Sequence, residues 1–167
     1  MKLNTMKDLY IDQLRDLYSA EDQLLNALPK MAQAASSADL QKAFQDHLGE
    51  TRNQKQRLEQ IFSGLGVVPQ GETCQAMQGL IKEGESIINA QADPTVRDAA
   101  LIAAAQRVEH YEMAGYGSVR TYADELGYSN AKSLLQQTLD EEGAADKKLT
   151  SLAQGGLFSS GINQRAI

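Results

Sequence analysis

The sequence has few cysteine, aromatic and proline residues, and each shortage excludes a class of structure. Its 167 residues include one cysteine, three prolines and no tryptophan, and aromatic residues make up 5% of the chain. A single cysteine, Cys74, excludes an internal disulfide framework and fits a reducing compartment. Abundant Ala, Leu, Gln and Glu residues favour helices over sheets. The length is that of one domain with a sizeable core.

Long apolar runs and an excess of basic residues are also missing. No apolar stretch approaches the length of about 20 residues that crosses a bilayer, and no apolar signal core follows Met1. Asp and Glu outnumber Lys and Arg by 22 to 16, which gives a net charge of −6. Acidic surfaces repel phosphate groups. We therefore expect a cytoplasmic protein that binds neither nucleic acid nor membranes.

Start and stop signals predict two long helices in the first part of the chain. Thr5 and Asp8 form a capping pattern at the start of the first helix, in which Pro29 is expected to kink or weaken one turn. The stretch Ser36–Asp39 interrupts this helix and supplies caps for the second. Gly64–Gly66 ends the second helix, since glycine is the usual left-handed terminator.

Similar signals predict two more long helices after an irregular segment. Residues 67–93 are read as a crossover that carries one modest helix. Asp93–Pro94 begins the third long helix, which continues to Leu126-Gly127, and the fourth begins near Ser129. Two helical hairpins joined by one long crossover is the connectivity of ferritin-like bundles. The expected fold is all-α, a ferritin-like four-helix bundle with an extra short helix in the crossover.

The end of the chain changes in composition. Past Ala153 it becomes rich in Gly and Ser, which is typical of a mobile terminus. We expect a helical bundle over residues 1–155 and a flexible tail over residues 156–167.

Six acidic residues lie in or beside the stripes that these helices should bury. They are Glu21, Glu50, Glu109, Glu112, Glu142 and Asp146. A buried carboxylate costs several kcal/mol unless something neutralises it. Glu21 and Glu142 fall within leucine stripes and are the hardest to explain as surface charges. The alternative for each is a buried ion pair with Lys or Arg.

The interpretation of the remaining acids depends more on the residues around them. Glu109 and Glu112 are one turn apart, so they repel each other unless a divalent cation lies between them. The alternative for this pair is a solvated helix face. Glu50 lies at the edge of the inward face of the second helix, one turn after His47. This histidine is either a hydrogen-bonded core residue or a ligand opposite the acids.

Four stretches of the sequence carry a family resemblance. They are Tyr18–Glu21, Arg97–Gln106, Val108–Glu112 and Gln137–Glu142. Residues 5–153 resemble the YciE/YciF-type branch of the ferritin-like superfamily, a group of bacterial stress-associated proteins. The resemblance implies a dinuclear iron or manganese centre. It assigns core ligands to Glu21, Glu50, Glu112 and Glu142, and terminal or switching ligands to Glu109, Asp146 and His47.

The chain departs from the superfamily pattern at two positions. Asn53 and Asp146 stand where the superfamily usually has metal-binding histidines. The expected site is therefore rich in oxygen ligands, which suit Mn²⁺, Fe³⁺, Mg²⁺ or Ca²⁺ better than Fe²⁺ or Zn²⁺.

Two functions follow from these expectations. The first is a di-metal carboxylate protein of the stress response that reacts with peroxide or oxygen. The second is a non-catalytic helical bundle whose acids share protons or pair with basic residues. A homodimer is the expected assembly. Whether the chain is an enzyme stays open on the sequence alone.

Overall fold

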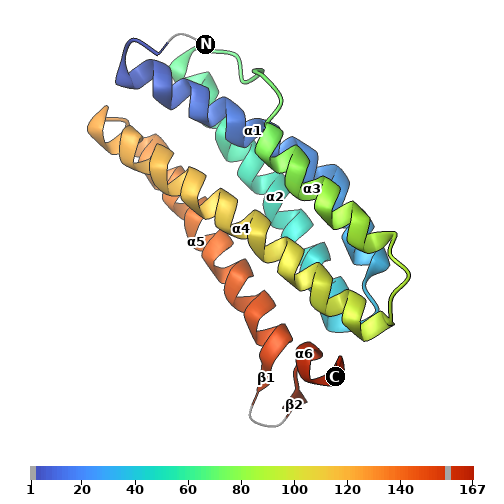
Figure 1. The fold of residues 1–167 in the computed structure, drawn as a ribbon. Helices are drawn as coiled ribbons and strands as arrows, with labels where there is room; N and C mark the ends of the chain where they lie inside the picture. Colours follow the sequence, from blue (N-terminus) through green and yellow to red (C-terminus); the bar gives the residue numbers. More distant parts are fainter. Residues whose placement is uncertain (1–2, 157–158) are drawn as a thin grey trace.

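A computed structural model describes residues 3–156 and 159–167 as an all-α bundle (Figure 1). Its long helices are α1 (Met6–Ala34), α2 (Ala38–Leu65), α4 (Pro94–Glu125) and α5 (Ser129–Gln154). Short connections fold α1 against α2 and α4 against α5, and the crossover helix α3 (Gln75–Ile88) joins the two hairpins. The predicted fold class is confirmed.

The helices begin and end where the sequence signals place them. Thr5 Oγ1 accepts a hydrogen bond from the Asp8 backbone N–H at 3.1 Å, and Asp8 Oδ2 accepts one from the Thr5 N–H at 2.9 Å. At the start of α4, Asp93 Oδ1 accepts a hydrogen bond from the Thr95 backbone N–H at 2.8 Å. Gly66 ends α2 with φ of 68°, a left-handed conformation that glycine adopts without strain. Pro29 lies inside α1, which continues past it.

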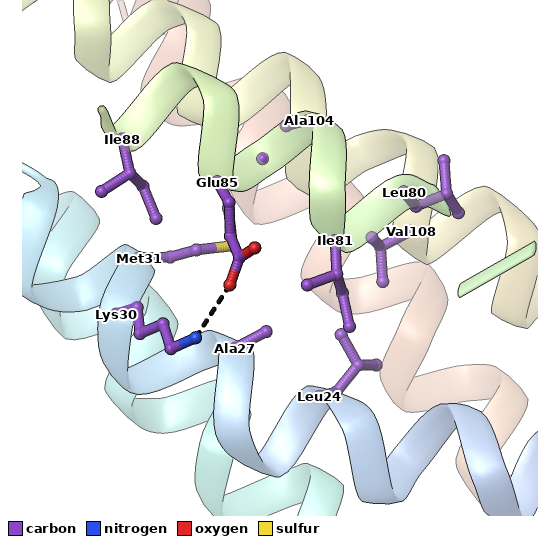
Figure 2. Close-up of a pocket in the computed structure, with 11 residues that line it drawn as sticks. Leu24, Ala27, Lys30, Met31, Leu80, Ile81, Glu85, Ile88, Ala104 and Val108 are labelled. Carbon is purple, nitrogen blue, oxygen red and sulfur yellow. Dashed lines mark hydrogen bonds and ion pairs between the residues drawn. The ribbon is translucent and has the colours of Figure 1, made fainter. Parts of the chain in front are cut away.

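The crossover helix α3 packs against α1 and α4. Figure 2 shows that apolar side chains of the three helices face one another there: Leu24, Ala27, Met31, Leu80, Ile81, Ile88, Ala104 and Val108. Lys30 Nζ lies 2.8 Å from Glu85 Oε1 at the rim of this contact. The packing leaves an apolar cavity of about 20 Å³. None of the predicted site residues lines that cavity.

Cys74 begins α3 and is buried. Its Sγ lies 3.0 Å from the Tyr111 hydroxyl of α4 and 3.3 Å from Asp16 Oδ2 of α1. Burial raises the pKa of the Cys74 thiol, which keeps it protonated. The residue therefore anchors the start of the crossover between the two hairpins.

The buried apolar residues form two clusters, separated by a layer of polar side chains. Along α1, for example, Leu14 and Leu17 belong to one cluster and Leu24 and Leu28 to the other, with Glu21 between them. Each of the other long helices also passes from one cluster to the other with buried polar residues between them, so these residues meet at one level of the bundle. We call them the central polar layer: Glu21, His47, Thr51, Gln54, Glu109, Glu112, Thr138 and Glu142.

The C-terminal segment differs from the predicted mobile tail. The strands β1 (Gly155–Gly156) and β2 (Ser159–Ser160) pair antiparallel, and the short helix α6 (Ile162–Arg165) follows. The side chain of Ile162 is buried in the apolar cluster that includes Leu149. Residues 157–158, part of the same prediction, lie outside the described residues. Burying one large aliphatic side chain stabilises by about 1.5–3 kcal/mol, which favours docking of α6.

None of the helices in the described part of the chain is both long and apolar enough to span a membrane.

Candidate metal centre

All four long helices contribute to the central polar layer. Glu21 comes from α1, His47 from α2, Glu109 and Glu112 from α4, and Glu142 from α5. One possible ligand atom from each of the last four residues lies within 4.8 Å of the others. All five side chains are at least nine-tenths buried. Helix periodicity explains this convergence, because each residue occupies the inward stripe of its helix.

Most of the polar atoms in this group make no hydrogen bond within the described residues. The unpartnered atoms are both oxygens of Glu112 and of Glu142, Oε2 of Glu21 and of Glu109, and Nε2 of His47. The His47 nitrogen lies 3.4 Å from Glu109 Oε1 and 3.8 Å from Glu142 Oε2. A buried polar atom without a partner costs about 1–3 kcal/mol. A cation held among these seven atoms would supply the partners that they lack.

Burial and mutual repulsion favour the protonated forms of Glu21, Glu112 and Glu142 when no cation is present. Burial raises the pKa of Glu21 to about 8, against the opposing effect of its hydrogen bond with Tyr116. Burial, followed by the charges of Glu21 and Glu109, raises the pKa of Glu112 well above its usual range. The pKa of Glu142 is also raised well above its usual range, by burial and then by the charges of Glu112 and Glu109. A bound divalent cation reverses this preference, because it favours the charged carboxylates.

The imidazole of His47 connects the layer to the surface of α2. Its Nδ1 lies 3.1 Å from Glu50 Oε2, and the Glu50 side chain is 44% exposed. Burial lowers the pKa of His47, but the carboxylates of Glu109 and Glu50 outweigh it, and the net pKa is raised. A proton on Nδ1 shared with Glu50 leaves Nε2 facing the acids as a possible ligand. Glu50 thus contacts the predicted ligand His47 but does not join the group of four buried ligand atoms.

Asp146 is placed at the edge of the bundle. Its Oδ1 accepts a hydrogen bond from Gln106 Nε2 at 3.0 Å and lies 3.4 Å from His110 Nε2. The His110 side chain is 67% exposed, so this contact lies at the surface of the bundle. The structure therefore places four of the six predicted acids in the central polar layer: Glu21, Glu109, Glu112 and Glu142. Asp146 lies outside this layer.

Two contacts of the layer were missed by sequence reasoning. The Tyr116 hydroxyl donates a hydrogen bond to Glu21 Oε1, a contact between α4 and α1 that helix periodicity alone does not predict. Arg57 binds Glu141 at 2.6 and 2.7 Å, and Gln54 donates to the same carboxylate at 3.2 Å. The available signal was the spacing of Gln54 and Arg57, three residues apart on the inward edge of α2.

The donor set of the layer fits a hard metal ion. Four carboxylates and one imidazole offer mainly oxygen ligands, as Mn²⁺ and iron prefer in carboxylate sites. The unpartnered buried oxygens provide the negative charge that such an ion requires. The residues present therefore fit the group that the family resemblance implies.

Comparisons with known proteins agree with this fold. A family profile described as "Domain of unknown function (DUF892)" matches residues 5–166. Protein YciF of Escherichia coli (strain K12) is 49% identical over 154 residues, which cover 92% of this chain and 93% of YciF.

Two solved structures are also similar. The crystal structure of the E. coli stress protein YciF matches with a TM-score of 0.87 and 48% identity, over 90% of this chain and 95% of that one. The structure of YcfI from Rhodopseudomonas palustris matches with a TM-score of 0.88 and 46% identity, over 91% and 97% of the two chains.

Proposed function

The chain belongs to the DUF892 family of YciF-type ferritin-like proteins, and we propose that it binds iron or manganese in its central polar layer. The family resemblance predicted from the sequence is confirmed by the matches to YciF. Because the E. coli relative is described as a stress protein, we place the proposed metal binding in the stress response. The ligands are Glu21, His47, Glu109, Glu112 and Glu142.

The observation that carries this proposal is the set of unpartnered buried atoms in the layer. Buried acids in proteins are normally neutralised by a basic partner. Within the described residues, the only basic side chain near them is His47, since Arg57 is engaged by Glu141. One imidazole balances at most one charged carboxylate, so the other acids must either keep their protons or bind a cation. Metal ions supply both the charge and the missing contacts.

The surrounding residues hold these ligands in place and cover the layer toward both ends of the bundle. Tyr116 fixes one oxygen of Glu21, and Glu50 orients the ring of His47. The two apolar clusters close the layer from either side. Metal ions held by Glu21, His47, Glu109, Glu112 and Glu142 would supply redox chemistry toward peroxide or oxygen.

Metal content and thermal stability test the proposal together. Chelator-treated protein is mixed with Mn²⁺, or with Fe²⁺ without oxygen, and bound metal is measured by elemental analysis after gel filtration. We expect about two ions per chain, as in related di-metal bundles. Metal at about 100 times its Kd stabilises the folded state by about 2.7 kcal/mol. For a domain of this length that raises the Tm by roughly 5–10 °C.

A matched pair of variants shows where the metal binds. Glu142→Gln removes a buried charge of the layer, and Glu125→Gln makes the same change at an exposed position of α4. We expect the first variant to lose bound metal and the Tm increase, and the second to keep both. Wild-type protein that binds no metal, with a Tm unchanged by Mn²⁺ and Fe²⁺, would contradict the proposal.

A second function is favoured by the protonation of the acids. The pKa of Glu142 is raised by burial and by the charges of Glu112 and Glu109. Acids that keep their protons in this way form a neutral layer, as a non-catalytic bundle requires. In that case Glu142→Gln would preserve or increase stability, and added metal would leave the Tm of wild-type protein unchanged.

A further inference from the structure

A cleft of about 90 Å³ lies between α2 and α5 and reaches the central polar layer. Its floor is formed by His47 and Glu109, which are both more than nine-tenths buried. Ala144 of α5, at its outer side, is exposed to solvent. The volume is several times what one water molecule needs, so small hydrated species fit.

Two polar atoms without hydrogen-bond partners belong to the residues of this floor. They are Nε2 of His47 and Oε2 of Glu109. The other acids of the layer, Glu21, Glu112 and Glu142, are at most 1% exposed. A ligand that arrives through the cleft therefore meets the layer first at His47 and Glu109.

We propose that this cleft is the route by which a divalent metal ion reaches the central polar layer, and that Lys148 limits the rate of its passage. The inference rests on the proposed function, because it assigns a path to the same metal ion.

Charged side chains at the mouth of the cleft support the role of Lys148. Lys148 Nζ lies 2.9 Å from Asp46 Oδ2, and Lys42 contacts the same carboxylate at 2.8 Å. Asp46 is thus neutralised from two sides, and the other acids that line the cleft are Glu50 and, at its floor, Glu109. A positive charge at this position repels an approaching cation. Removing Lys148 alone leaves the mouth more acidic.

The walls of the cleft are made of small side chains. Ala43 of α2 faces Ala144 and Ala145 of α5 across it. Interiors are close-packed, so a space of this size persists only where side chains are short. A leucine at Ala145 adds three carbon atoms to the wall and obstructs the passage without touching the charges of the layer.

The test is the rate of Mn²⁺ uptake by metal-free protein, followed by loss of the electron paramagnetic resonance signal of free Mn²⁺ after rapid mixing. We expect Ala145→Leu to slow uptake severalfold. Lys148→Met is expected to accelerate uptake by about fivefold, since a unit charge repels a divalent ion by about 1 kcal/mol at a separation of about 8 Å in water. The final amount of Mn²⁺ per chain stays that of wild-type protein in both variants.

Each variant has a control on the same kind of helix surface. Ala114→Leu makes the same change at an exposed alanine of α4 outside the cleft. Lys147→Met removes the same charge from the residue next to Lys148, also exposed and also outside the cleft lining. Both controls should keep the wild-type rate. Because the two lysine variants have equal net charge, a difference between them is local to the cleft.

The outcomes separate this inference from the proposed function. If wild-type protein binds Mn²⁺ but Ala145→Leu and Lys148→Met load at the wild-type rate, the cleft is not the route and only this inference fails. If wild-type protein takes up neither Mn²⁺ nor, without oxygen, Fe²⁺, the proposed function and the route both fail. Should circular dichroism show that Ala145→Leu is unfolded, equal rates for Lys148→Met and Lys147→Met overturn the inference.

Discussion

The hydroxyl of Tyr116 on α4 donates a hydrogen bond to Glu21 Oε1 on α1, and neither side chain has any exposed surface. The contact joins the two helical hairpins inside the central polar layer. It also satisfies one oxygen of a carboxyl group whose pKa is raised to about 8 by burial. The tyrosine therefore contributes to stability through its hydroxyl as well as through its ring.

Removal of that hydroxyl should destabilise the bundle. Tyr116→Phe leaves Glu21 Oε1 without a partner, and we expect the free energy of unfolding to fall by about 1–2 kcal/mol in urea denaturation of metal-free protein. The control is Tyr10→Phe, because the Tyr10 hydroxyl is also buried but makes no hydrogen bond within the described residues. That variant should be neutral or slightly stabilising. Equal losses in both variants would contradict the role given to the Tyr116 hydrogen bond.

The stability of metal-free protein should fall as the pH rises. The Glu21 carboxyl has a pKa of about 8 in the folded state against an ordinary value of 4.5, so the folded state holds its proton over a range where the unfolded chain has lost it. The folded state then binds more protons, and the free energy of unfolding decreases with pH across that range. This contribution is full below pH 4.5 and is lost as the pH passes through about 8.

Urea midpoints measured at roughly pH 6 to pH 9 check this dependence. Glu142→Gln should reduce the slope, because the pKa of Glu142 is raised by burial in the same direction. Saturating Mn²⁺ should flatten or reverse it, since metal binding requires charged carboxylates. A metal-free protein that becomes more stable between neutral and alkaline pH would show that the acids are not buried as described.

Glu50 should tune metal affinity through His47. Its Oε2 lies 3.1 Å from His47 Nδ1, and such outer contacts typically change affinity by about 10–100-fold when removed. Glu50→Ala is therefore expected to weaken Mn²⁺ binding by about tenfold at unchanged stoichiometry. Glu72→Ala, at an exposed acid before α3, should have no effect. Loss of one ion per chain would instead make Glu50 a ligand, as the sequence predicted.

Asp146 should be dispensable for metal binding. Its carboxylate accepts a hydrogen bond from Gln106 and lies close to His110 at the edge of the bundle. We expect Asp146→Asn to keep the metal content and the metal-dependent Tm increase of wild-type protein, whereas Glu142→Gln loses both. Loss of metal from Asp146→Asn would restore the ligand role that the sequence predicted for it.

Two glycines of α4 should respond in opposite ways to alanine. A Cβ at Gly115 would lie 2.7 Å from Leu17 Cδ2 in the core, whereas a Cβ at Gly117 has no neighbour within 4 Å. Gly117→Ala is expected to raise the free energy of unfolding by about 0.5–1 kcal/mol, because alanine is the better helix former. Gly115→Ala should lower it by about 1 kcal/mol through overpacking. Thermal denaturation of both variants tests the close approach of α1 and α4.

The helices were predictable because local signals and periodicity agree in this sequence. Thr5, Gly66 and Asp93 each fix a helix end through their own chemistry, so the boundaries need no tertiary information. The burial of Glu21 and Glu142 was predictable for the same reason, since leucines define the inward stripe around them.

The contacts between helices were not predictable in this way. Periodicity gives the direction of Asp146 but not the position of Gln106 opposite it, which depends on how α4 and α5 are aligned along their axes. The pairing of Arg57 with Glu141 likewise depends on how α2 and α5 are aligned along their axes. Docking of α6 depends on a single buried residue, Ile162, in a segment whose composition is typical of a mobile terminus.

The central polar layer has a consequence for how the bundle opens. It divides the buried apolar residues into two clusters, one toward each end of the long helices. Without a cation, the two ends are joined across their middle mainly by helix backbone, so either end can unfold while amide protons at the other remain protected. A metal ion bound by all four helices couples the ends, and hydrogen exchange then requires the whole bundle to open at once. Metal occupancy would thus set the size of the cooperative unit as well as its stability.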